Sequence, residues 1–84
     1  MPTISVFYGI TIMMYLKDKE HNPPHIHAFY GSEAATFLIS NGEIYQGRFP
    51  KRGKKLVKEF IIKYRNELLQ MWETGTYCRL EGLN

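Results

Sequence analysis

The chain has 84 residues, of which 44% are hydrophobic and 23% are charged, and its formal net charge is +3. This length allows one domain, residues 1–84, with a small core, and the composition excludes a disordered protein. No apolar run approaches the roughly 20 residues of a membrane helix, and no basic segment precedes the first apolar run as in a signal peptide. The single cysteine, Cys78, excludes an intramolecular disulfide and a cysteine-based metal cluster. We therefore expect a cytoplasmic protein with no membrane partner.

Short runs with two-residue alternation predict a series of strands before Pro50. The predicted strands are residues 3–7, 10–16, 25–30, 33–39 and 43–49. One face of the second strand would hold Ile10, Ile12, Met14 and Leu16. Asn41-Gly42 is the strongest hairpin signal, because both residues tolerate a positive φ. Tight turns between consecutive strands favour an antiparallel meander of about five strands.

After Pro50 the apolar period changes from two residues to about 3.6, which predicts one long amphipathic helix over residues 53–73. Its apolar stripe would be Leu56, Val57, Phe60, Ile61, Tyr64, Leu68, Met71 and Trp72. Pro50 suits a helix entrance and Gly75 suits a helix end. The predicted fold is therefore α+β, with one helix covering one face of the sheet.

A single helix leaves the other face of such a sheet uncovered. By alternation, that face would hold several of Met13, Tyr15, Phe29 and their neighbours. An apolar face of this kind is typical of an interaction surface. We expect it to bind a small cognate protein partner or a second copy in a homodimer.

Positive charge is concentrated around the predicted start of the helix. Residues 48–65 carry eight basic side chains and one acidic side chain, Glu59, a local charge of +7 that leaves −4 for the rest. Cations at a helix start oppose the helix dipole, whereas free N–H groups beside Lys and Arg suit a phosphate. The predicted anion-binding or nucleic-acid-binding residues are Lys51, Arg52, Lys54, Lys55 and Lys58. The alternative is a basic helix face that is only solvated.

The stretch HNPPHIHAFYG contains the three histidines of the chain, His21, His25 and His27. On a strand, His25 and His27 point to the same side with Cα atoms about 6.6 Å apart, close enough to bind one metal ion. The stiff Pro23-Pro24 segment would let His21 close over that pair. Three imidazoles and a water would form an open site for zinc or a similar divalent ion, suited to hydrolysis of a phosphodiester or ester.

The same histidines permit two interpretations without a metal. His25 and His27 would act as general base and general acid in RNA cleavage, with Lys and Arg holding the phosphate. A less direct version is a His-hydrophobic-His nickase motif with Tyr64 as nucleophile. In the structural interpretation, the histidines are partly buried and bond to the backbone around the Pro-Pro turn. The residues alone leave the catalytic, metal-binding and structural interpretations open.

Three segments, MPTISVFYGI, HNPPHIHAFYG and LVKEFIIKYRNELLQMWE, together resemble a family of short bacterial and archaeal proteins described as a domain of unknown function, DUF4160. The resemblance covers nearly the whole chain. It implies a gene layout like that of toxin–antitoxin pairs, with a second small protein encoded nearby. It implies no catalytic residue, because none is assigned in the family.

Two functions follow as hypotheses. In the first, the protein is toxin-like and acts on RNA, with His25 and His27 as catalytic residues, the basic helix start holding phosphate and a cognate protein covering the open sheet face. In the second, it is a non-catalytic binding module of such a pair, with histidines that are structural or metal-binding. Growth arrest on expression would favour the first hypothesis.

Overall fold

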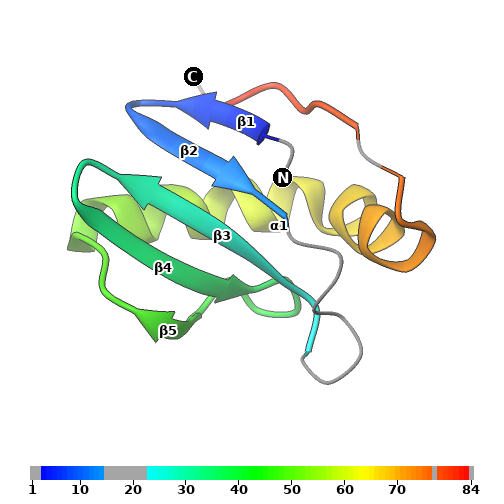
Figure 1. Cartoon of the computed structure of the whole chain (residues 1–84), viewed down its shortest axis with the longest axis horizontal. Coiled ribbons are helices and arrows are strands. Elements are labelled where there is room, and N and C mark those ends of the chain that lie inside the picture. Colours follow the sequence, from blue (N-terminus) through cyan, green and yellow to red (C-terminus); the bar gives the residue numbers. More distant parts are fainter. Residues whose placement is uncertain (1–2, 15–22, 77, 84) are drawn as a thin grey trace.

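The structure, a computed structural model, describes residues 3–14, 23–76 and 78–83. Its elements are, in chain order, β1 (Thr3–Phe7), β2 (Ile10–Met13), β3 (His25–Tyr30), β4 (Glu33–Leu38), β5 (Ile44–Gly47) and α1 (Lys51–Thr74). Each strand pairs antiparallel with the next, and the sheet order is β1-β2-β3-β4-β5. Figure 1 shows α1 lying across one face of this sheet. The predicted α+β fold, a meander with one long helix, is confirmed.

The core lies between α1 and the sheet face that α1 covers. Side chains alternate along a strand, so every second residue of β2 and β3 points into this layer. The rings of Phe7 and Phe60 stack there with their centroids 5.0 Å apart. The largest fully buried side chains include Ile4, Ile10, Ile12, Met14, Ile26, Phe37, Ile39, Val57, Phe60, Ile61 and Leu68. The predicted inward face of the second strand is thus confirmed at three positions, and Leu16 lies outside the described residues.

The helix begins two residues before the predicted start and ends one residue after the predicted end. Pro50 precedes it with an extended backbone, and its side chain makes no capping hydrogen bond. Gly75 ends it at φ 73°, with its N–H donating to the carbonyl oxygen of Met71 at 3.0 Å. Tyr64 has non-helical backbone angles and marks a kink. Within the described part of the chain, no helix combines the length and the hydropathy of a membrane span.

The turns differ from the predicted pattern. The hairpin with positive φ at both central residues is Tyr8-Gly9, at 51° and 79°. Between β4 and β5 the connection is longer, because β4 ends one residue earlier and β5 begins one residue later than predicted, and only Gly42 adopts a positive φ there. Asn41 instead accepts a hydrogen bond from the backbone N–H of Glu43 at 2.9 Å through its side chain. The Asn-Gly signal therefore marks a turn, but not a two-residue hairpin.

β3 and α1 run in opposite directions, so the end of each lies beside the start of the other. At one end, Tyr30 lies near Phe49, just before α1, with ring centroids 6.4 Å apart. At the other end, the first residue of β3, His25, contacts Trp72 in the last turns of α1. The C-terminal segment follows β1, where the N–H of Leu80 donates to the carbonyl oxygen of Ile4 at 2.9 Å. His25 and Tyr30, which belong to the same stretch HNPPHIHAFYG, therefore lie at opposite ends of the molecule.

Candidate functional site

The histidine pair lies at the start of β3. His25 is only 5% exposed, and its ring centroid is 4.9 Å from that of Trp72. Its Nδ1 donates to the carbonyl oxygen of Pro23 at 2.9 Å, which requires the proton on Nδ1 and leaves Nε2 as the basic nitrogen. The rings of His25 and His27 meet edge to face, with centroids 5.2 Å apart. The two imidazoles are therefore adjacent, as predicted, but His25 is packed inside the protein.

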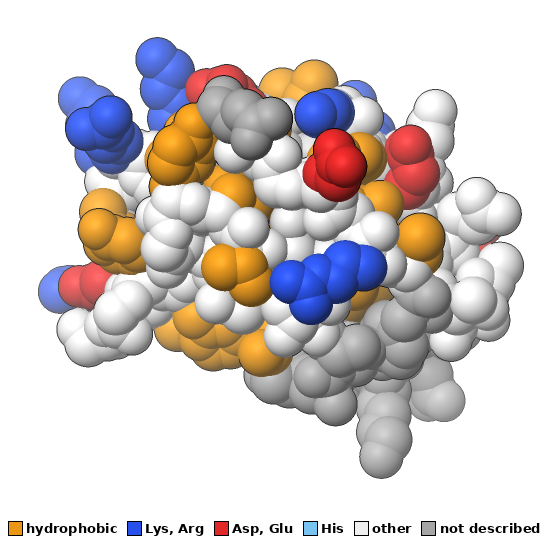
Figure 2. Space-filling model, turned by 90° about the horizontal axis from the view of Figure 1, so that it is seen from above, with side chains coloured by type: hydrophobic (Ala, Val, Ile, Leu, Met, Phe, Trp, Pro, Cys, Tyr) orange, Lys and Arg blue, Asp and Glu red, His pale blue; other side chains and the backbone are white. Residues whose placement is uncertain are grey.

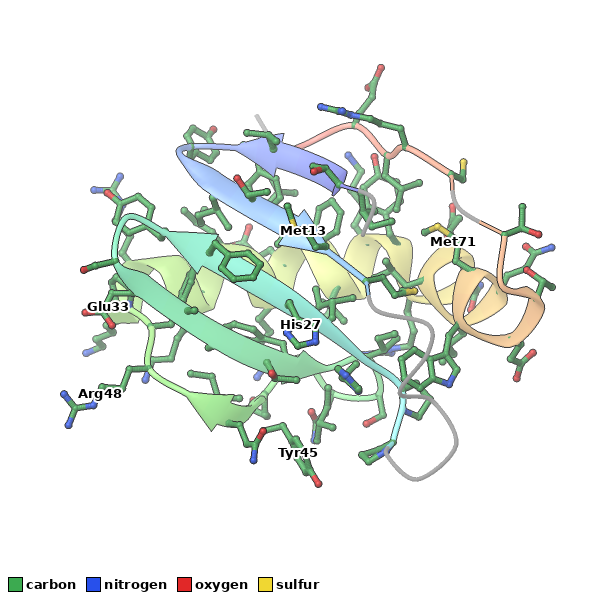
Figure 3. All side chains as sticks on the ribbon, in the orientation of Figure 1. Met13, His27, Glu33, Tyr45, Arg48 and Met71 are labelled. Atoms are coloured by element: carbon green, nitrogen blue, oxygen red, sulfur yellow. The ribbon has the colours of Figure 1, made fainter. Side chains whose placement is uncertain are left out.

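His27 belongs to the open face of the sheet. Its Cα is paired with Met13 on β2 and with Thr36 on β4, so the three side chains share one face. Figure 3 shows Met13 and His27 in front of the sheet, with α1 behind it. This arrangement agrees with the alternation read from the sequence.

The predicted metal site includes His21, which lies outside the described residues, so its convergence on the pair stays a prediction. Among the residues that the structure describes, no group of three His, Cys, Asp or Glu side chains is placed to hold a metal ion. His25 could offer only Nε2 to a metal, because Nδ1 is bonded to Pro23. A zinc site here would therefore need His21 or another residue beyond the described ones.

The predicted cations surround the start of α1. Lys51, Arg52, Lys54 and Lys55 are exposed, and within the described residues none of them forms an ion pair. The first turn of α1 contains no acidic residue, and Pro50 offers no capping side chain to its N–H groups. Figure 2 shows Lys and Arg side chains gathered at the end of the molecule where α1 begins. Three features of this end favour binding of an anion: it carries cations, those cations are exposed, and the first N–H groups of α1 have no capping side chain.

Lys58, the fifth predicted cation, differs from the other four. Its Nζ lies 2.6 Å from a carboxylate oxygen of Glu43, in the loop between β4 and β5. The hydrogen bond from Lys58 and the charge of Lys58 lower the pKa of Glu43 below its usual value. The positive charge of Lys58 is thus already compensated, and it is a weaker candidate for binding an anion.

The histidine pair and the basic end do not form one site. Trp72, which touches His25, is 20 residues further along α1 than Arg52. At a helical rise of about 1.5 Å per residue, about 30 Å of helix lies between them, and the kink at Tyr64 makes the straight-line distance shorter than that. One bound phosphate cannot contact both groups. In the predicted mechanism, His25 and His27 react at a phosphate that these cations hold. The fold instead separates the histidines from the cations.

A hollow of about 440 Å³ lies beside the basic end. It is bounded by the Tyr8-Gly9 turn, the end of β3 and the first turns of α1. Its lining includes Tyr8, Tyr30, Arg52, Leu56, Glu59 and Leu83. Tyr8 and Tyr30 are 57% and 44% exposed. The hollow thus combines an apolar floor with exposed rings and charges of both signs.

A comparison with protein families places this chain. The model of the family described as Domain of unknown function (DUF4160) matches residues 9–73. The chain belongs to the DUF4160 family. The matched DUF4160 segment contains β2 to β5, both described histidines and every predicted cation, whereas β1 and the C-terminal segment lie outside it. No curated protein and no solved structure matches the chain.

Sequence reasoning on this DUF4160 domain missed Tyr8 and Tyr30. Neither belongs to a charge run. Tyr30 lies inside the stretch HNPPHIHAFYG, where the histidines carried the interpretation, and the sequence indicates Tyr8 only as part of a turn. A signal is present at Tyr8, because a bulky aromatic residue is unusual in a turn that favours Asn or Gly. Tyr30 offers no such signal, because an aromatic residue at a strand end is common.

Proposed function

We propose that this protein binds nucleic acid, with RNA as the favoured ligand, at the start of α1. The observation that carries this proposal is the group of four exposed cations, without ion-pair partners in the described part of the chain, around a helix start that has no acid and no capping side chain. Repulsion among these cations and with the helix dipole opposes folding, and a bound polyanion would remove that cost. The exposed tyrosines next to Arg52 favour a single-stranded ligand, because unpaired bases stack on aromatic rings.

Fluorescence anisotropy with short RNA and DNA oligomers at low ionic strength tests this proposal. Replacing Lys54 and Lys55 with Gln should weaken binding and reduce the slope of log affinity against log salt by about 0.7 for each phosphate of a single strand that the protein no longer neutralises. The control is the double substitution of Lys63 and Arg79 with Gln, which removes the same charge from exposed positions outside the first turns of α1. If the wild-type protein shows no salt-sensitive binding, or both double variants behave alike, the proposal is wrong.

The geometry supports the non-catalytic form of this function better than the catalytic form. His25 is buried against Trp72 and bonded to Pro23, as expected for a side chain that braces the entry into β3. RNA cleavage by His25 and His27 remains the second candidate, because their rings are adjacent. In that case His27→Ala should abolish both RNA cleavage and growth arrest on expression. If the wild-type protein neither cleaves RNA nor arrests growth, the catalytic form is excluded.

We further propose that the protein is one member of a toxin–antitoxin-like pair and that its open sheet face binds the other member. This face contains Val6, which is 50% exposed, and the half-buried Met13 and Phe29. Val6→Lys should prevent co-purification with the protein encoded beside it while leaving RNA binding unchanged. Ile62→Lys, at an equally exposed position on α1, is the control. The alternative is a homodimer formed through the same face, and light scattering on the protein alone would detect it.

A further inference from the structure

The hollow at the start of α1 is built by close packing of three segments. A Cβ atom at Gly9 would lie 3.2 Å from the ring of Tyr30, so that ring rests against the Tyr8-Gly9 turn. A Cβ atom at Gly53 would lie 2.7 Å from the ring of Phe49, so the first turn of α1 packs directly on that ring. Each glycine thus allows a close approach that a side chain would prevent. The hollow is a formed feature of the packing, in the volume range of small-molecule sites, about 300–1,000 Å³.

Tyr8 is poorly explained by folding alone. Its φ of 51° lies in the left-handed region, where a bulky side chain is unfavourable and Asn or Gly is preferred. Its side chain is 57% exposed, and its ring meets that of Phe7 only edge to face, with centroids 6.4 Å apart. A residue that strains the turn and buries little surface gains little for the fold. Its exposed ring at the rim of the hollow offers a stacking surface.

The charges in the hollow discriminate between ligands. Arg52 suits a phosphate, but Glu59 would repel a simple anion that filled the space. Within the described residues, neither Arg52 nor Glu59 has an ion-pair partner. A carboxylate accepts hydrogen bonds from an exocyclic amino group, as Asp and Glu do with cytosine N4. A ligand with a flat amino-bearing ring and a phosphate satisfies both charges.

We propose that this hollow binds one unpaired, amino-bearing nucleobase of single-stranded RNA. The base stacks on Tyr8 and Tyr30, Glu59 accepts a hydrogen bond from its amino group and Arg52 contacts the adjoining phosphate. A second hollow shares Pro50 with the first and is lined by Glu33 as well as by Arg48 and Lys54. Its two cations outnumber its one carboxylate and contact the next phosphate of the strand. This inference rests on the proposed function, because it names the ligand of the same basic end.

Tyr8→Asn separates binding from folding. Asn suits the left-handed turn better than Tyr, so the variant should unfold at the same or a higher temperature than the wild type. It should nevertheless bind an oligocytidylate at least about 5-fold more weakly, since stacking on one aromatic residue contributes about that much or more per base. Tyr30→Leu should weaken binding to the same extent. Tyr45→Leu is the control, because Tyr45 is 47% exposed on β5 and does not line the hollow.

Two further measurements test the identity of the ligand. Binding to duplex RNA should be the same for wild type and Tyr8→Asn, because paired bases cannot enter the hollow. The wild type should prefer oligocytidylate over oligouridylate, and Glu59→Gln should reduce that preference, since uracil has a carbonyl where cytosine has its amino group. Cytidine monophosphate that competes as well as the oligomer would show that a free nucleotide is the ligand and would overturn the proposal.

Failure of the nucleobase site and failure of RNA binding give different results. If the wild type does not bind RNA at low salt, the proposed function fails. If the wild type binds and the Lys54 and Lys55 variant binds more weakly, but Tyr8→Asn and Tyr30→Leu bind oligocytidylate like the wild type, only the nucleobase site is overturned.

Discussion

His25 and Trp72 are in ring contact, with centroids 4.9 Å apart, and this contact joins the first residue of β3 to the last turns of α1. Both side chains are 5% exposed. The hydrogen bond from Nδ1 to the carbonyl oxygen of Pro23 also holds the imidazole in place. One residue of the histidine motif therefore connects the Pro-Pro segment, the sheet and the helix.

His25→Ala should consequently destabilise the protein. The substitution removes the buried ring packed on Trp72 and its hydrogen bond to the carbonyl oxygen of Pro23. Loss of a typical hydrogen bond costs about 0.5–1.5 kcal/mol, and the lost packing adds to that cost. For a domain of this size, each kcal/mol lowers the melting temperature by roughly 4–8 °C. Urea and thermal unfolding measure the change, with Gln46→Ala, at an exposed position on β5, as the control. Equal stability of His25→Ala and wild type would mean that His25 does not brace the fold.

Gly53→Ala should also be destabilising, although alanine normally stabilises a helix by about 0.5–1 kcal/mol relative to glycine. The added Cβ would meet the buried ring of Phe49 at 2.7 Å, and overpacking of this kind costs about 1–3 kcal/mol. In a Phe49→Leu background, Gly53→Ala should cost less, because the shorter side chain relieves the overlap. A double-mutant cycle by chemical denaturation measures this coupling, and additive effects would contradict it.

The ion pair between Glu43 and Lys58 should appear in the pH dependence of stability. The pKa of the Glu43 carboxyl is lower in the folded than in the unfolded protein, so the unfolded state binds more protons in this window. The contribution of the pair is present above the usual carboxyl pKa of 4.5 and is lost as the pH falls through the lower, folded pKa. NMR titration should show the Glu43 midpoint below 4.5 in the wild type and closer to it in Lys58→Gln. An unchanged midpoint in the variant would exclude the pair in solution.

The same pair predicts unequal roles for the cations. Lys58→Gln should weaken RNA binding less than Lys55→Gln, because the charge of Lys58 is compensated by Glu43 while Lys55 has no ion-pair partner among the described residues. Anisotropy titrations at one low salt concentration compare the two variants directly. A larger effect of Lys58→Gln would mean that the ion pair opens on binding.

The metal hypothesis makes a separate prediction that involves His21. If His21, His25 and His27 share a zinc ion, tag-free protein should carry about one zinc per chain, and His21→Ala should lose both the zinc and the stabilisation that zinc provides. Without zinc, His21→Ala should be as stable as the metal-free wild type, whereas His25→Ala should be less stable. Elemental analysis and thermal unfolding of both variants measure this. Protein purified without metal, and not stabilised by added zinc, would contradict the hypothesis.

Local patterns in the sequence determined the elements of this protein. Alternation at Ile10, Ile12 and Met14 and the helical stripe through Phe60 and Trp72 were sufficient for strands and helix, because each depends on the residue spacing of one segment. Short turns then required an antiparallel meander. The family also followed from local motifs, and the match over residues 9–73 confirms it.

The candidate site was decided by tertiary structure. The sequence-based interpretation groups His25 with Arg52 because both carry suitable chemistry, but the antiparallel course of β3 and α1 places them at opposite ends. The hollow beside Arg52 brings together Tyr8, Tyr30 and Leu83, which are far apart in the chain. No spacing rule connects such residues, because their proximity depends on the packing of a turn, a strand end and a helix start.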